Sequence, residues 1–276
     1  MSDLQTRIDS LTSQDAPDAA EARAAVSDLL AALEAGEVRS ASRGEDGVWR
    51  ANGWVKRGIL LGFRVGQIED QSMGPFAFFD KDTYPTRPFS ADAGVRIVPG
   101  GSTVRRGSYL APGVVCIPPM YVNVGAYVDG GTMVDSHALV GSCAQIGRDV
   151  HLSAAAQVGG VLEPIGAAPV VIEDGVFVGG GCGVYEGTVV RENAVLAAGV
   201  ILTRSSRVYD LVNETVLRSS ADSPLEIPAG AVVVPGSRAV DSEFGRANGL
   251  ALAAPMIVKY RDASTDASTT LEDALR

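Results

Sequence analysis

The chain has 276 residues, of which 46% are hydrophobic, and a formal net charge of -10 at pH 7. This acidic balance argues against a nucleic-acid partner or an anionic membrane surface, because both require a basic face. No apolar run approaches the length of a membrane span, and the first residues lack the apolar stretch of a secretory signal. The three cysteines (Cys116, Cys143 and Cys182) fit no metal-binding or redox spacing, and an odd count suits a reducing compartment. We therefore expect a cytoplasmic protein whose cysteines are small buried residues.

Residues 1–93 predict a mostly helical N-terminal domain. Apolar residues recur at helical spacing over residues 4–11 and 26–33, and a third apolar helix begins near Trp54. Residues 69–94 are rich in Pro, Phe and Asp, so we expect irregular structure there.

From residue 98 onward, an aliphatic residue returns at every sixth position. Seventeen of the eighteen positions hold Val, Leu or Ile, and the remaining one holds Cys116. The positions are Val98, Val104, Leu110, Cys116, Val122, Val128, Val134, Val140, Ile146, Leu152 and Val158, and then, after an interruption, Ile172, Val178, Val184, Val190, Leu196, Leu202 and Val208. A period of six does not fit an amphipathic helix, whose period is 3.6.

A six-residue repeat with one aliphatic position is typical of a hexapeptide β-helix. Each hexad forms a short strand and a corner, three hexads complete one coil, and stacked coils bury a continuous aliphatic column. Corners require residues that tolerate positive φ, and such residues stand three positions after the aliphatic ones. They are Gly101, Gly107, Gly113, Gly125, Gly131, Gly175, Gly181, Gly187 and Gly199, with Asp149 and Asn193.

The fold class is therefore mainly β: a parallel β-helix over residues 94–210, a helical N-terminal domain and a small C-terminal β extension over residues 211–276. The interruption at residues 159–171 reads as a loop, and long loops on a rigid scaffold often carry function. The pattern does not say whether this loop replaces a hexad or lengthens a corner. In the extension, AGAVVVPG and LALAAPMIVKY look like strands, and a polar tail follows from Ala263.

Several stretches of the sequence resemble one known family. The stretch YVNVGAYVDGGTMVDSHALVGSCAQIGRDVHLS closely resembles the tetrahydrodipicolinate N-succinyltransferases, and the likeness continues in VYEGTVV, SSRVYD and IPAGAVVVPGS. It covers nearly the whole chain. The resemblance implies a left-handed β-helix and a homotrimer with substrate between neighbouring prisms. It also implies transfer of a succinyl group from succinyl-CoA, the co-substrate, to the amine of ring-opened tetrahydrodipicolinate (L-2-amino-6-oxopimelate). No permanently bound cofactor and no metal are implied.

Two residues match substrate-binding positions of that family. Asp135 follows the inward Val134, so strand alternation points it outward. The resemblance places it at the substrate amine, as an orienting group and a possible base. Arg96, in AGVRIVPG, matches a family arginine that binds substrate, and a guanidinium can clamp a carboxylate in two-point fashion.

A second carboxylate and a second cationic stretch complete the predicted site. Many relatives carry a glutamate at the position of Gly183, often with a catalytic role. This chain has none there, so either Glu186, in VYEG, serves as the second catalytic carboxylate or Asp135 works without a partner. Arg207 and Ser205, in SSRVYD, are predicted to bind substrate.

The two histidines receive lesser roles. His137 stands where many relatives have Trp, and the family match argues against a catalytic base there, although other hexapeptide acyltransferases use one. We expect His151 to be a structural polar residue on a coil. The residues that bind the CoA phosphates are not readable from the sequence. Arg191, Arg204 and Lys259 are candidates by charge alone.

Three other functions compete with this interpretation. Another CoA-dependent hexapeptide acyltransferase, with an acetyl donor, would share the prism, but the head and tail segments match the succinyltransferases. A hexapeptide-type carbonic anhydrase requires three histidines around a metal, and the chain has two. A non-catalytic β-helix scaffold for protein binding leaves the runs VDSHALVGS and SSRVYD on outward positions unexplained.

Overall fold

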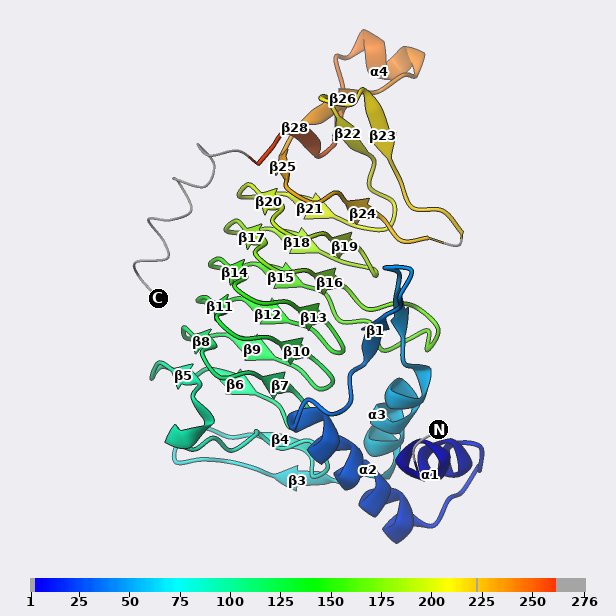
Figure 1. Cartoon of the computed structure of the whole chain (residues 1–276), viewed down its shortest axis with the longest axis vertical. Coiled ribbons are helices and arrows are strands. Elements are labelled where there is room, and N and C mark those ends of the chain that lie inside the picture. Colours follow the sequence, from blue (N-terminus) through cyan, green and yellow to red (C-terminus); the bar gives the residue numbers. More distant parts are fainter. Residues whose placement is uncertain (1–2, 222, 262–276) are drawn as a thin grey trace.

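A computed structural model describes residues 3–221 and 223–261, and the polar tail predicted from Ala263 lies outside this range. Three N-terminal helices lie beside the lower coils of a prism, and a small β extension stands at its other end (Figure 1). The helices are α1 (Asp3–Thr12), α2 (Ala19–Glu34) and α3 (Gly53–Val65), as the apolar spacing predicts. Within the described residues, no helix is long and apolar enough to cross a membrane.

The strands of the prism belong to three sheets, which we name after their first strands. Each strand pairs in parallel with the equivalent strand of the next coil. The β5 face contains β5 (Arg96–Ile97), β8 (Val115–Cys116), β11 (Met133–Val134), β14 (His151–Leu152), β17 (Phe177–Val178), β20 (Val195–Leu196) and β25 (Ala231–Val234). The β6 face contains β6 (Thr103–Val104), β9 (Tyr121–Val122), β12 (Leu139–Val140), β15 (Gln157–Val158), β18 (Gly183–Val184) and β21 (Ile201–Leu202). The β7 face contains β7 (Tyr109–Leu110), β10 (Tyr127–Val128), β13 (Gln145–Ile146), β16 (Val171–Ile172), β19 (Val189–Val190) and β24 (Glu226–Ile227). The prediction of a left-handed parallel β-helix is confirmed.

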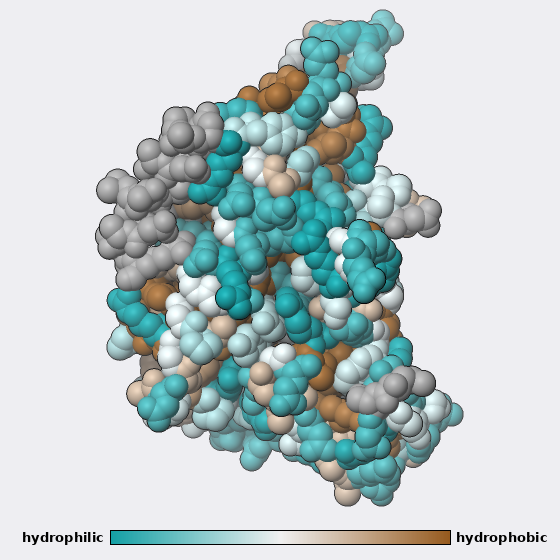
Figure 2. Space-filling view, in the orientation of Figure 1, coloured by the Kyte–Doolittle hydropathy of each residue, from teal (hydrophilic) through white to brown (hydrophobic). Residues whose placement is uncertain are grey.

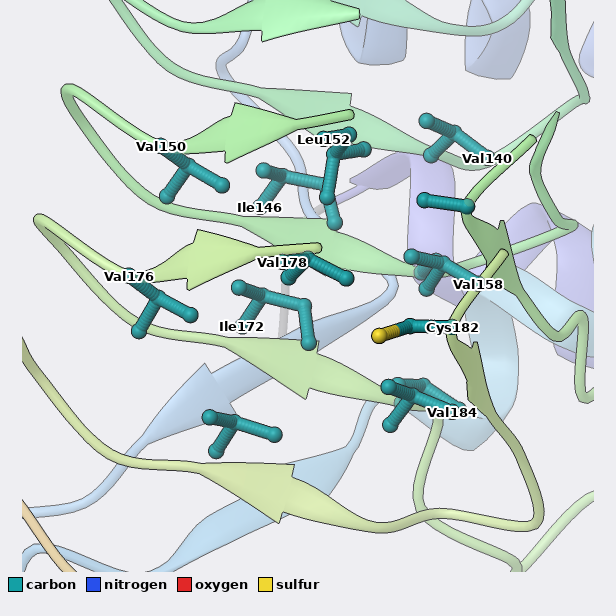
Figure 3. Close-up of a cluster of buried hydrophobic side chains, with 14 of the residues drawn as sticks. Val140, Ile146, Val150, Leu152, Val158, Ile172, Val176, Val178, Cys182 and Val184 are labelled. Carbon is teal, nitrogen blue, oxygen red and sulfur yellow. The ribbon is translucent and has the colours of Figure 1, made fainter. Parts of the chain in front are cut away.

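The aliphatic positions form the core of the prism. Ile146 and Ile172 are fully buried there and stack from one coil to the next, as Figure 3 shows for the middle of the column. Burying one such side chain stabilises the fold by roughly 1.5–3 kcal/mol relative to leaving it in water. All eleven residues predicted at the corners have positive φ. His137, Cys143 and Ala155 occupy equivalent corners with φ of 61°, 66° and 59°, although they are not glycines.

The predicted column is wrong at both ends. Ile97, not Val98, pairs with Cys116, because the corner between β5 and β6 holds one extra residue. At the other end Val208 is buried but lies in β22, outside the stack, and Ile227 pairs with Val190 in its place. The chain therefore leaves the prism after β21 and returns with β24 and β25.

The loop after β15 lengthens one corner and replaces no hexad. Gln157 and Val171 stand 14 positions apart instead of six, yet β16 stacks on β13 and continues the β7 face. Each face therefore keeps its identity above and below the loop. Nζ of the buried Lys56 in α3 donates to the carbonyl oxygen of Ala167 (2.5 Å), which ties the loop to the helical domain.

Outside the prism, short antiparallel elements connect the larger parts. They are the hairpins β1 (Ala41–Arg43)–β2 (Trp49–Ala51) and β3 (Ile68–Asp70)–β4 (Phe79–Lys81), the turn η1 (Ala91–Ala93), and in the C-terminal extension β22 (Val208–Asp210), β23 (Thr215–Leu217), β26 (Ser237–Ala239), α4 (Glu243–Ala247), β27 (Ala251–Ala253) and β28 (Met256–Tyr260). The β3–β4 hairpin lies in the region predicted to be irregular. The domain limits at residues 93 and 210 remain a prediction.

Candidate functional site

Asp135 stands outside the prism, as strand alternation predicts. It follows the buried Val134 of β11, and its side chain is about one-third exposed (29%). One carboxylate oxygen accepts the N–H of Ser136 (2.6 Å), and the other lies 3.9 Å from Nε2 of His151. The carboxylate is thus held by its own corner while one oxygen faces an imidazole.

His151 therefore belongs to the surroundings of Asp135, which the sequence analysis missed. Its ring packs edge-on against Phe177 with centroids 5.2 Å apart, and its side chain is mostly buried. The register explains the proximity, because His151 pairs with Met133, two residues before Asp135. Three hexads make a coil of eighteen residues, and His151 follows Met133 by eighteen positions, so the period alone could have placed the two residues side by side.

Arg96 lies on the same face as Asp135, two coils lower. It pairs with Val115, which pairs with Met133, so Arg96 and Met133 stand in one outward column. Neighbouring coils are about 4.8 Å apart, so the backbones of Arg96 and Met133, two coils apart, are separated by a distance on the order of 10 Å. Within the described residues, the guanidinium of the exposed Arg96 makes no hydrogen bond or ion pair, so its donors are available to a carboxylate.

Glu186 occupies a different corner. It follows β18 at the edge between the β6 and β7 faces, whereas Asp135 stands between the β5 and β6 faces. Its carboxylate accepts the backbone N–H of Arg204 (2.9 Å), and its φ is 55°. The residue lines a cavity of about 430 Å³ together with Gly166 and Ala168 of the long loop. A single chain therefore does not bring Glu186 and Asp135 together.

The ring of Tyr185 occupies the space beside position 183. A Cβ added to Gly183 would lie 2.4 Å from Cε2 of Tyr185, and one added to Gly159 would lie 2.7 Å from Cδ1 of the same ring. The tyrosine thus fills the outward surface where a residue larger than glycine at position 183 would stand. Sequence reasoning noted the absent glutamate but missed this neighbour.

Ser205 and Arg207 lie together beyond the last strand of the β6 face. They line a cavity of about 420 Å³, with Arg238 of β26 on its other side. Oγ of Ser205 is 3.0 Å from Oγ1 of Thr203. Two guanidinium groups beside one cavity suit an anionic ligand. Arg238 was missed because it is distant in sequence and its strand carries no motif.

The three candidates for binding the CoA phosphates, Arg191, Arg204 and Lys259, have different surroundings. Arg191 is mostly buried and pairs with Glu173 (2.9 Å) and Glu226 (2.7 Å), so its charge serves the protein itself. The exposed Arg204 donates to the carbonyl oxygens of Ser220 (3.0 Å) and Ala221 (3.3 Å), on the rim of the Glu186 cavity. Lys259 lies on β28.

The histidines and cysteines offer no metal centre. Across residues 3–221 and 223–261, no group of three or more His, Cys, Asp or Glu is placed to hold a metal ion. His137 is exposed at a left-handed corner, where its backbone N–H donates to Pro119. Cys116, Cys143 and Cys182 are buried free thiols, as expected.

A prism of hexapeptide coils, with an acid and an arginine on one outward face, is characteristic of a hexapeptide-repeat acyltransferase. Two family models match: the N-terminal domain of tetrahydrodipicolinate N-succinyltransferase over residues 3–65, and the hexapeptide repeat of succinyl-transferase over residues 169–204.

Curated relatives agree over the whole chain. The 2,3,4,5-tetrahydropyridine-2,6-dicarboxylate N-succinyltransferase of Azoarcus sp. is 45% identical, covering 100% of this chain and 99% of the relative. The enzyme of the same name from Polynucleobacter asymbioticus is 44% identical (96% and 93% covered), and that from Acinetobacter baylyi 43% (100% and 99%). The chain belongs to the tetrahydrodipicolinate N-succinyltransferase family, which confirms the resemblance seen in the sequence.

Proposed function

We propose that the chain transfers a succinyl group from succinyl-CoA to the amine of L-2-amino-6-oxopimelate, in lysine and diaminopimelate biosynthesis. The observation that carries this proposal is the full-length similarity to curated succinyltransferases, together with Asp135 at the outward corner that the family motif specifies. The substrates are small molecules. A cytoplasmic homotrimer without nucleic-acid or membrane partners completes the proposal.

In the proposed reaction, the substrate amine attacks the thioester carbonyl carbon directly. The carbon–nitrogen bond forms, the carbonyl oxygen becomes an oxyanion, and the amine loses a proton to a base. The carbon–sulfur bond then breaks, and the CoA thiolate leaves and takes up a proton. The products are the N-succinyl amide and free CoA, and no covalent bond to the enzyme is needed.

Asp135 is the residue proposed to orient the amine and accept its proton. Its carboxylate is part-exposed and fixed on one side by the N–H of Ser136, and its second oxygen makes no hydrogen bond to the described residues. His151 stands beside that oxygen, on the side of the next coil. Arg96, on the same face, is proposed to bind a substrate carboxylate.

The remaining predicted residues require a neighbouring chain. Glu186 lies at the opposite edge of the β6 face and in a higher coil than Asp135, and Ser205 and Arg207 lie beyond the last strand of that face. Packing of prisms side by side would bring the edge of one chain to the Asp135 corner of the next. We propose that Glu186 serves as the second catalytic carboxylate and that Ser205 and Arg207 bind substrate in this shared groove.

The test uses the purified protein with succinyl-CoA and L-2-aminopimelate, a stable analogue of the ring-opened substrate. Mass spectrometry detects the N-succinyl product, and acetyl-CoA is assayed in parallel. A succinylated product supports the proposal. Product from acetyl-CoA alone would leave an acyltransferase with a different donor, and absence of product and of CoA binding would favour a scaffold.

Glu186→Gln separates the two possibilities for the second carboxylate. Glutamine keeps an oxygen that accepts the N–H of Arg204, so the corner is preserved. A fall in kcat of about 10²-fold or more supports a catalytic Glu186, whereas unchanged kcat would mean that Asp135 works without this partner.

A further inference from the structure

A third cavity lies away from Asp135, between the N-terminal hairpin and the β7 face. Its volume is about 520 Å³, and Arg39, Arg43 and Trp49 form one wall. Gln145 and Glu173 of the prism line the other side. The hairpin strand β1 lies beside the middle coils in Figure 1, and Figure 2 shows that hydrophilic side chains prevail on the face seen in this view. None of these residues belongs to the proposed transferase site.

Arg39 is the central feature of this cavity. The half-buried guanidinium stacks on the ring of Tyr127, 3.7 Å from its centroid, and lies 5.5 Å from the centroid of Trp49. Nε donates to Oε1 of Gln145 (2.9 Å). Within the described residues, the two terminal nitrogens of Arg39 have no hydrogen-bond partner, and no carboxylate lies within ion-pair distance. Burial lowers the pKa of Arg39, although Tyr127 and nearby acids oppose that effect.

The surroundings hold this guanidinium in place. Gln145 is buried, and its amide nitrogen donates to the carbonyl oxygens of Cys143 (2.9 Å) and Ala144 (3.3 Å), so only its oxygen is left for Arg39. Tyr127 stacks in turn on Tyr109, with centroids 4.5 Å apart. A guanidinium fixed by stacking and one hydrogen bond leaves its planar pair of terminal donors oriented for a carboxylate.

The charge of the lining determines which carboxylate would fit. Glu173 is neutralised by Arg191 (2.9 Å) and by Arg43 (3.6 Å). Asp174 and Glu192 also line the cavity, and within the described residues neither makes an ion pair. Phosphates and dicarboxylates would be repelled by these acids. A ligand that carries one carboxylate and also ammonium groups would complement both Arg39 and the two unpaired acids.

We propose that this cavity binds a free α-amino acid whose side chain ends in a cationic group. Its carboxylate pairs with the terminal nitrogens of Arg39, and its ammonium groups face Asp174 and Glu192. The charge-assisted hydrogen bond to Arg39 is the stronger anchor, because that guanidinium is half-buried, whereas the two acids are exposed.

Isothermal titration of the full-length protein, without CoA or acceptor, tests this proposal with three probes. L-Lysine carries both kinds of group, L-norleucine lacks the side-chain ammonium, and 1,5-diaminopentane lacks the carboxylate. We expect saturable binding of L-lysine and at least tenfold weaker binding of the other two. No binding of L-lysine, or equal binding of all three probes, would overturn the proposal.

Two variants test whether L-lysine binds in this cavity. Arg39→Gln and Asp174→Asn should each weaken L-lysine binding, the first by at least tenfold, while Arg246→Gln, at an exposed arginine of α4, should bind like the wild type. Asparagine at 174 keeps an oxygen for the N–H of Arg148, so this variant decides the matter if Arg39→Gln fails to fold. Wild-type affinity in a folded Arg39→Gln or in Asp174→Asn would refute the site. Since no acyl transfer is measured, failure here leaves the proposed transferase function unaffected.

Discussion

Gly107→Ala tests how the helical domain is seated on the prism. Gly107 forms the corner between β6 and β7, with φ of +73°. An added Cβ would lie 2.4 Å from Cδ2 of Leu30 in α2 and 3.0 Å from Cγ2 of Val124. Leu30 is buried in the helical core, so it can move only by repacking its neighbours.

The expected cost has two parts, and a second corner separates them. Placing alanine in a left-handed conformation costs about 1–2 kcal/mol, and overpacking a core adds about 1–3 kcal/mol. Gly181 has φ of +65°, and an added Cβ there would meet nothing within 4 Å. Gly181→Ala should therefore show the first cost alone, and Gly107→Ala both.

Urea unfolding, followed by circular dichroism at one fixed protein concentration, measures the difference between the two variants. We expect Gly107→Ala to lower the free energy of unfolding by about 1–3 kcal/mol more than Gly181→Ala does. If both variants lost the same free energy of unfolding, the reasoning would be refuted, because the close approach of Leu30 to Gly107 would then add no cost.

Three further predictions concern the core and the charges. Ile172→Ala, at a fully buried position of the column, should lower the free energy of unfolding by about 2–5 kcal/mol, measured by the same urea titration. Burial raises the pKa of Cys116 to about 12 and of Cys143 to about 11, so both thiols should resist iodoacetamide at pH 8 until urea unfolds the chain, as mass spectrometry would detect. The hydrogen bond from Arg23 lowers the pKa of Asp82, so this carboxylate stabilises the fold above its unfolded pKa, about 3.9. Asp82→Asn should therefore be less stable than the wild type at pH 7, and the deficit should shrink as the pH falls below about 4; a deficit independent of pH would contradict this.

The period of six predicted most of the prism, because an inward aliphatic residue and a left-handed corner are both local requirements. It misplaced the ends, because nothing local shows that the corner before Val104 has an extra residue or that Ile227 rejoins the stack. The return of the chain after an excursion depends on pairing between distant strands, such as β25 with β28.

The sequence allowed single residues of the candidate site to be predicted, but not which of them lie next to one another. Outward exposure of Asp135 followed from strand alternation, whereas its neighbour His151 depends on the coil register. The stacking of Arg39 on Tyr127 joins the N-terminal segment to the prism, and no sequence pattern connects the two. Which residues face one another across chains depends on packing that a single sequence does not express.

The most direct test of the central claim is a comparison of Asp135→Asn with Asp149→Asn in the succinyl-CoA assay. Asp149 is an exposed acid at another corner, with φ of 53°, a conformation that asparagine tolerates. If Asp135 accepts the amine proton, its variant should lose about 10²–10⁴-fold in kcat with unchanged CoA binding, while Asp149→Asn retains wild-type activity. Full activity in a correctly folded Asp135→Asn would contradict the account.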